Sequence, residues 1–184
     1  MPEHDYGGFG PLFAFEGIVP KIAPDAFIAP TAAVIGDVEV GSQTGIWFHC
    51  LVRGDMGFVR IGARTNIQDG TVIHVDSDGM DTHIGDDVTV GHNAVIHACT
   101  LKNRAFVGIG ATVLDGAVIE EGGMLGAGGL LTPGKVIGPN ELWTGAPAKL
   151  RRVMDDAELE KFARNARVYR ELAARFRTSL RSVG

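Results

Sequence analysis

Residues 101–138 read LKNRAFVGIGATVLDGAVIEEGGMLGAGGLLTPGKVIG, and this stretch decides the fold. Within it an aliphatic residue returns every six positions, at Leu101, Val107, Val113, Ile119, Leu125, Leu131 and Ile137. A helix would space its apolar residues three and four apart, and a half-exposed strand would space them two apart. A strict period of six predicts a short strand, a turn and another short strand, stacked in successive rungs.

The same period continues toward the N-terminus. Before Leu101 the aliphatic repeat starts are Ile22, Ile28, Val34, Val40, Ile46, Val52, Ile61, Ile67, Ile73, Ile84, Val90 and Ile96. Four positions after most starts stands a small or β-branched residue, in the series Ala26, Ala32, Val38, Thr44, Cys50, Thr65, Thr71, Val88, Ala94, Thr100, Ala105, Ala111, Ala117, Gly123 and Gly129. We expect both sets to point into one core.

Two insertions interrupt the period. Three extra residues separate Val52 from Ile61, and five separate Ile73 from Ile84, where residues 75–83 (VDSDGMDTH) are acidic. A packed coil has no interior room for additional residues, so we expect both insertions to leave it as surface loops.

Beyond Ile137 the segment GPNELWTGAPAKLRR (138–152) ends the repeat through glycine and proline. From Asp155 onward helical spacing takes over, at Leu159, Phe162, Ala163, Ala166, Tyr169, Leu172, Ala173, Phe176 and Leu180. Asp155 and Glu158 resemble a capping box. We therefore predict an N-terminal segment (1–21), an all-β solenoid (22–142), a connector (143–154) and one amphipathic C-terminal α-helix (155–182), which packs along the solenoid or a neighbouring chain.

Composition narrows the possible partners. The 184 residues are 45% hydrophobic, which suits one substantial core. A net charge of −5 disfavours nucleic acid and anionic membranes as partners. The opening MPEHDYGGFGPLFAFEG lacks the pattern of a secretory signal, so we expect a cytoplasmic protein. Cys50 and Cys99 are too few for a disulfide framework, and we expect both to be reduced and buried.

The repeat places several polar residues relative to one another. Rungs three apart lie on one face of the solenoid, so Arg53, His74 and His97, each directly after a repeat start, should form one column. By the same reasoning Asp69 lies beneath His92 on the preceding face. His74 and His97 can share a metal ion, whereas His92 reaches it only if a neighbouring subunit presents that face.

A threefold ring closes three such contacts. Each site of a homotrimer would then take His74 and His97 from one chain and His92 from the next, which is the three-nitrogen shell of a catalytic zinc with an open position. A single histidine on a turn is more often a surface hydrogen-bonding group, and we give that ordinary role to His4, His49 and His83. Three histidines placed at one height on two adjoining faces favour the metal site.

Four stretches carry a family resemblance: RGD at 53–55, NIQDG at 66–70, His74, and GHNAVIH at 91–97. They resemble the signature of the γ-class carbonic anhydrases, and residues 12–175 are compatible with that family. The resemblance implies a trimeric left-handed parallel β-helix with a C-terminal helix and a metal at each subunit interface. It implies His74, His92 and His97 as metal ligands, Arg53 paired with Asp69 across the interface, Asp55 supporting that pair, Gln68 orienting the metal-bound water, and Asn66 near the site.

In such a site zinc-bound hydroxide, formed because the metal lowers the pKa of its water to about 7, attacks carbon dioxide to give bicarbonate. Two positions depart from the best-known form of the family, since Met56 and Ser77 stand where that form carries glutamates, one of them the proton shuttle. Tyr169 matches a tyrosine of the subgroup that lacks those glutamates, and Asp76, Asp78 and Asp81 are other candidate proton carriers. Zinc is the default metal, and three histidines also accept Co²⁺ or Fe²⁺.

Other functions share this repeat. Hexapeptide acyltransferases resemble it and use one histidine as a general base with coenzyme A as donor, but they would leave the three histidines, Arg53 and Gln68 unexplained. Within the γ-class-like group, a thioesterase or a catalytically silent metal-binding homologue would carry the same ligands. The absence of the two glutamates favours the catalytically silent homologue.

Overall fold

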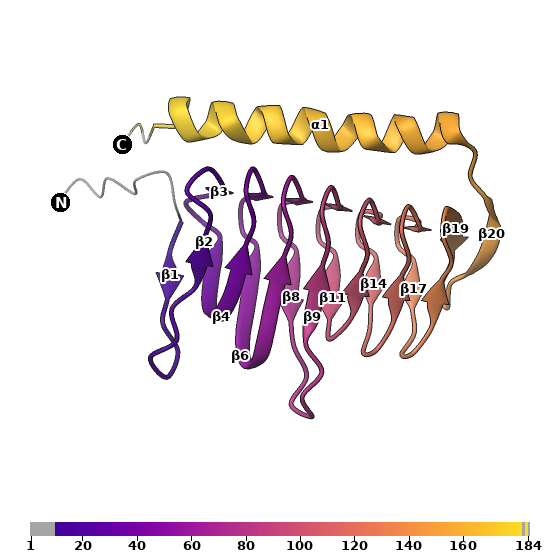
Figure 1. Ribbon diagram of the computed structural model, residues 1–184, viewed down its shortest axis with the longest axis horizontal. Helices are drawn as coiled ribbons and strands as arrows, with labels where there is room; N and C mark the ends of the chain where they lie inside the picture. Colours follow the sequence, from indigo (N-terminus) through magenta and orange to yellow (C-terminus); the bar gives the residue numbers. More distant parts are fainter. Residues whose placement is uncertain (1–9, 182, 184) are drawn as a thin grey trace.

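The computed structural model describes residues 10–181 and 183. It is a parallel β-solenoid of about seven turns with one C-terminal helix, which confirms the predicted fold class. The turns stack along the long axis of the molecule, and the helix runs beside them for most of that length (Figure 1). His4, the first nine residues of the expected N-terminal segment, and residue 182 of the expected helix lie outside the described residues.

Two sheets form the walls of the solenoid. The first has twelve strands: β1 (Leu12–Phe13), β2 (Lys21–Ile22), β4 (Ala33–Val40), β6 (Leu51–Ile61), β8 (Val72–His74), β9 (Thr82–Ile84), β11 (Val95–His97), β12 (Thr100–Leu101), β14 (Thr112–Val113), β15 (Val118–Ile119), β17 (Leu130–Leu131) and β18 (Val136–Ile137). The second has eight: β3 (Phe27–Ile28), β5 (Gly45–Ile46), β7 (Asn66–Ile67), β10 (Thr89–Val90), β13 (Phe106–Val107), β16 (Met124–Leu125), β19 (Glu141–Thr144) and β20 (Lys149–Val153). All pairings between named strands are parallel except the one that joins β19 to β20.

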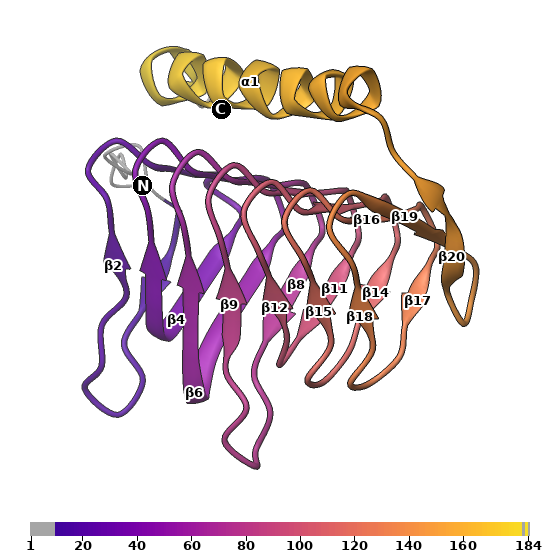
Figure 2. The same ribbon diagram turned by 45° about the vertical axis from the view of Figure 1, so that its right-hand side comes forward.

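The twelve-stranded sheet covers two faces because β6 turns a corner. The start of β6 pairs with β8 and its end pairs with β9, so two rows of strands diverge from it (Figure 2). The insertion between Val52 and Ile61 therefore stays in a strand, and the expectation of a surface loop there is wrong. Close backbone contact at the bend makes this possible, since a Cβ on Gly36 of β4 would lie 2.2 Å from the Gly54 carbonyl oxygen of β6.

The core is a column of aliphatic residues inside these walls. Every repeat start from Ile28 to Ile137 is buried, as the period predicts. The second inward series is also buried apart from Thr100, whose place is taken by Cys99. The rung from Ile96 to Leu101 has five residues in place of six. The inward residue keeps its distance from the following repeat start, two positions before Leu101, and is therefore Cys99. Both cysteines are free and buried.

Helix α1 (Asp156–Ser179) lies against the eight-stranded face. It begins with a capping box, in which the Asp155 carboxylate accepts from the Glu158 amide. Aromatic rings join helix and sheet, with centroids 5.0 Å apart for Phe162 and Phe106 and 5.4 Å for Tyr169 and Trp47. No helix of the described residues has the length and apolar character needed to cross a membrane.

Candidate metal centre

His74 and His97 stand in one column on adjacent turns. They are register partners at the ends of β8 and β11, so their side chains leave the same face in the same direction. His74 Nδ1 and His97 Nε2 face each other at 3.3 Å. Arg53 precedes them in the column, one residue beyond the pairing of Val52 with Ile73.

A carboxylate binds the far nitrogen of each ring. His74 Nε2 lies 2.9 Å from Asp55 Oδ1, and His97 Nδ1 contacts Asp115 Oδ1. Burial raises the pKa of Asp55, but hydrogen bonds from His74 and Arg53 outweigh it and hold the pKa below its ordinary value. An ionised Asp55 requires the proton of His74 on Nε2, which leaves the lone pair of Nδ1 directed at His97.

Asp115 is a functional candidate that the sequence reasoning missed. It lies on the turn after β14, the strand that pairs with β11 one coil beyond His97. The signal was present in the repeat, because Val113 is three rungs after Ile96 and the same column extends to the residues after Val113.

His92 lies on the adjoining face, after β10. The left-handed backbone of Asn93, with φ of 56°, turns the chain there. His92 Nδ1 is 3.0 Å from Asp69 Oδ2, and its Nε2 is 3.3 Å from the hydroxyl of Tyr169 on α1. Burial, followed by the nearby Asp69 carboxylate, raises the pKa of Tyr169, so the phenol stays protonated and can donate to His92 Nε2.

A buried polar row lies between this face and the helix. Gln68 Nε2 donates to Asn66 Oδ1 at 3.1 Å, and Asn66 Nδ2 donates to Thr89 Oγ1 at 2.9 Å. All three residues are buried. Hydrogen bonds to its neighbours therefore hold each side-chain amide in one orientation, so Gln68 and Asn66 can orient a bound molecule without moving themselves.

Two further predicted residues contact this arrangement, and the others lie apart from it. Arg53 contacts Asp55 within the chain, and Asp69 contacts His92. Met56 is exposed, and Ser77 and Asp78 lie in the turn of the 75–81 loop. Asp81 is tied back to the solenoid, where it accepts from the Phe58 amide at 2.8 Å. His83, on β9, packs its ring against Phe58 of β6.

The geometry of the two paired histidines fits a tetrahedral zinc. Two nitrogens bound to one zinc at about 2.0 to 2.1 Å are about 3.3 to 3.4 Å apart, and the observed separation is 3.3 Å. Each ring also has the outer carboxylate that typically orients a metal-binding histidine. Across residues 10–181 and 183 of a single chain, no group of three or more His, Cys, Asp or Glu side chains is arranged to hold a metal ion.

Comparisons with known proteins agree on one family. The chain is 45% identical over 159 residues to γ carbonic anhydrase 2, mitochondrial, of Arabidopsis thaliana, with 84% of this chain covered. It spans only 57% of that protein's length, and 58% and 62% of the lengths of two further Arabidopsis γ carbonic anhydrases. It is 42% identical to a carbonic anhydrase of Geobacillus kaustophilus, and the match covers 87% of both chains. No protein-family model matches the chain.

A solved structure agrees with the fold. The crystal structure of a hexapeptide transferase family protein from Anaplasma phagocytophilum superposes with a TM-score of 0.85 at 46% identity, covering 89% of this chain and 96% of that one. The period of six, the solenoid and these identities together show that the chain belongs to the γ-class carbonic anhydrase-like family of hexapeptide-repeat proteins.

Proposed function

We propose that this protein is a trimeric, metal-dependent enzyme for the reversible hydration of carbon dioxide to bicarbonate. One observation carries the proposal: two imidazole nitrogens face each other at 3.3 Å while carboxylates bind the opposite nitrogen of each ring. Facing imidazole nitrogens at this distance share a cation, either a proton in an N–H···N hydrogen bond or a metal ion. A divalent metal is the cation that two neutral imidazoles bind best.

The third ligand in this proposal is His92 of a neighbouring subunit. Its Nδ1 is bound by Asp69, so its Nε2 is the nitrogen left for a metal, and the Tyr169 hydroxyl that faces Nε2 at 3.3 Å in the single chain would give up that contact. Apolar side chains beside the candidate ligands support a subunit contact, since Val72 and Val95 are more than a third exposed and Ile109 is 57% exposed. A threefold ring buries all of these positions and completes three sites together.

When bound, zinc would lower the pKa of a coordinated water to about 7, and this supplies a nucleophile at neutral pH. The chain's own residues would do the rest. Gln68, fixed by Asn66, would orient the water by a hydrogen bond. Arg53 would pair with Asp69 of the adjacent subunit, and Asp55 would hold both Arg53 and His74 in place.

Proton release distinguishes this chain from the best-known form of the family. We place it in the subgroup without the two glutamates, because Met56 and Ser77 stand at those positions. Tyr169 lies against His92, which supports it as a group near the reacting water. The other candidate proton carriers are Asp76, Asp78 and Asp81 of the loop. Asp81 is the most tightly held of them, because it accepts from the Phe58 amide at 2.8 Å, whereas Asp76 accepts from the Asp78 amide at 3.4 Å.

A second candidate is thioester hydrolysis at the same metal, because metal-bound hydroxide can attack a thioester carbonyl as it attacks carbon dioxide. The missing glutamates instead favour a homologue without turnover. A silent metal-binding homologue would show the same ligands. An acyltransferase would need a single histidine base, which does not account for three histidines that each contact a carboxylate.

The deciding measurement combines metal content with stopped-flow hydration of carbon dioxide on protein purified without chelator. About one metal per chain with hydration would support the enzyme. Metal without hydration would favour the thioesterase or the silent homologue, and a thioester assay on the same sample would separate those two. Absence of metal would contradict the proposal and reopen the acyltransferase.

A further inference from the structure

A cavity of about 420 Å³ lies between α1 and the β10, β13 and β16 rungs. The solenoid contributes Thr89, Phe106 and Met124, and the helix contributes Phe162 and Ala163. None of the three candidate metal ligands lines it. Its volume falls in the range of small-molecule sites, and most of its lining is apolar.

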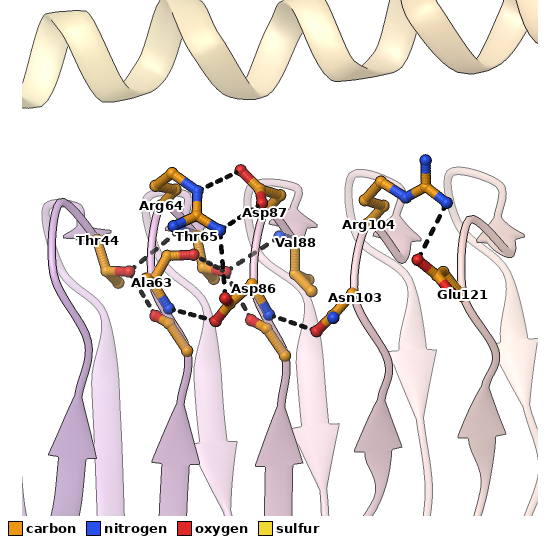
Figure 3. A network of polar contacts seen from close by, with 12 residues as sticks. Thr44, Ala63, Arg64, Thr65, Asp86, Asp87, Val88, Asn103, Arg104 and Glu121 are labelled. Atoms are coloured by element: carbon orange, nitrogen blue, oxygen red, sulfur yellow. Dashed lines mark hydrogen bonds and ion pairs between the residues drawn. The ribbon is translucent and has the colours of Figure 1, made fainter.

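Charged residues surround this apolar interior, and most of them are already paired. Arg64 binds Asp87 through two nitrogens at 2.9 and 2.7 Å and also reaches Asp86 (Figure 3). Arg104 binds Glu121 at 3.0 Å at the same edge of the solenoid (Figure 3). On the helix, Arg167 contacts Glu160. These residues form a rim whose charges largely cancel.

Two charged residues of the lining, Asp156 and Arg170, are not in these pairs, and they lie at opposite ends of the cavity. Asp156 is exposed in the first turn of α1, where the helix dipole favours a carboxylate. Arg170 is half-buried, and within the described residues no carboxylate lies within ion-pair distance of it. Fourteen residues of helix separate the two, about 21 Å at the helical rise. The Arg170 end is therefore the positive end of the cavity.

We propose that this cavity binds a small amphipathic organic anion, such as a carboxylate with an aliphatic tail. The anionic group would bind the guanidinium of Arg170, whose planar donors match a carboxylate. The apolar tail would lie along the helix toward Phe162, about 12 Å away by the helical rise, and against Phe106 and Met124. A partly desolvated guanidinium without a counter-ion is costly, and the ligand would supply that counter-ion.

The test is calorimetric titration of the full-length protein with sodium octanoate, using protein as purified and again after chelator treatment. Acetate serves as the probe with charge and no tail. We expect octanoate to bind saturably at about one per chain with or without metal, and acetate to bind at least tenfold more weakly. Because binding is measured directly, the result does not depend on the proposed hydration of carbon dioxide.

Four variants locate the ligand. Arg170→Gln should weaken octanoate at least tenfold, about 1.4 kcal/mol, and Ala163→Leu should abolish binding by filling the cavity. Arg164→Gln is the matched control, since Arg164 is exposed on the same helix and does not line the cavity. Circular dichroism checks that each variant is folded, and Arg170→Lys, which keeps the charge, should retain part of the affinity.

The proposal is overturned if octanoate does not bind the wild-type protein, or if it binds the Arg170→Gln and Arg164→Gln variants equally. Light scattering covers one further outcome. If octanoate fails to bind and Ala163→Leu changes the oligomeric state, the cavity belongs to a contact between subunits.

Discussion

Three carboxylates, Asp55, Asp69 and Asp115, determine which nitrogen of each candidate ligand can bind a metal. A hydrogen bond to one imidazole nitrogen fixes the tautomer and makes the other nitrogen a better ligand. In His97 and His92 the carboxylate is on Nδ1, and in His74 it is on Nε2. The difference follows from position, because Asp55 and Asp115 approach the His74–His97 pair from opposite sides along the column.

Asp115→Asn tests this arrangement at a residue that is not itself a ligand. The amide keeps the shape but loses the charge that orients His97, so zinc affinity should fall about 10- to 100-fold. Competition with a chelator of known affinity measures it, and circular dichroism should show an unchanged fold. Asp78→Asn in the exposed loop is the control and should leave affinity unchanged. Equal affinity for both variants would remove Asp115 from the site.

At the bend where β4 pairs with β6, residue 36 must be glycine for two reasons, its left-handed backbone and the lack of space for a Cβ. Its φ is +74°, and an added Cβ would lie 2.2 Å from the Gly54 carbonyl oxygen. Gly17 has a similar φ of +82° with nothing within 4 Å of such a Cβ. Both Ala variants should lose about 1 kcal/mol from the left-handed backbone.

The clash should cost Gly36→Ala a further 1 to 3 kcal/mol or so, as overpacking does. Urea unfolding at a fixed protein concentration measures the free energy of both variants. Because φ is matched, the difference between them reports the backbone contact alone. If the two variants lost equal stability, the bend would have to open easily.

At the scale of elements, the period of six predicts the core because every rung repeats one inward aliphatic position. The period predicts the inward positions less well where a rung is shorter or longer than six residues. The five-residue rung moves the inward position from Thr100 to Cys99, and the insertion after Val52 becomes a strand because Gly36 and Gly54 let two backbones approach. Asp115 lies in the same column as His74 and His97, one coil further along the solenoid. The carboxylate contacts of the histidines depend on side-chain rotamers, which spacing does not contain.

Aromatic side chains pack helix α1 against the solenoid, and several of these contacts involve Phe176 near its C-terminal end. The Phe176 ring lies 5.3 Å from Trp47 and 5.8 Å from Phe27. Phe176→Ala should cost about 2 kcal/mol, less than a fully buried phenylalanine because Phe176 is only partly buried. Trp47 packs against the rings of Tyr169 and Phe176. In the Phe176→Ala variant Trp47 becomes more exposed to water, so the tryptophan emission should shift to longer wavelength.

Val168→Ala is the control for this variant, since Val168 is 52% exposed on the same helix. It should change stability by less than about 0.5 kcal/mol. Unfolding curves and emission spectra of the two variants make the comparison. Matching spectra for both would show that the aromatic cluster does not hold the helix.

At the scale of the whole molecule, the proposed sites exist only between subunits, and mixing variants tests this directly. His92→Ala should lose metal at every site while remaining folded, because His92 lies outside the aliphatic core. His97→Ala should do the same. In a mixed trimer, a chain with His74 and His97 intact meets a neighbour with His92 intact at one of the three interfaces.

Co-expressed His92→Ala and His97→Ala chains should therefore regain about one metal per mixed trimer, although each variant alone binds none. Random mixing of equal amounts leaves about a quarter of the trimers unmixed, so the whole sample should hold about 0.25 metal per chain. The control is co-expression of wild type with a chain that carries both substitutions. Trimers with two wild-type chains then have one complete site, those with one wild-type chain have none and wild-type trimers have three, so this sample should also hold about 0.25 metal per chain. If His92→Ala alone kept its metal, the neighbouring subunit would supply no ligand. If the mixture stayed empty while the control bound metal, the two half-sites would not meet in the order that a threefold ring requires.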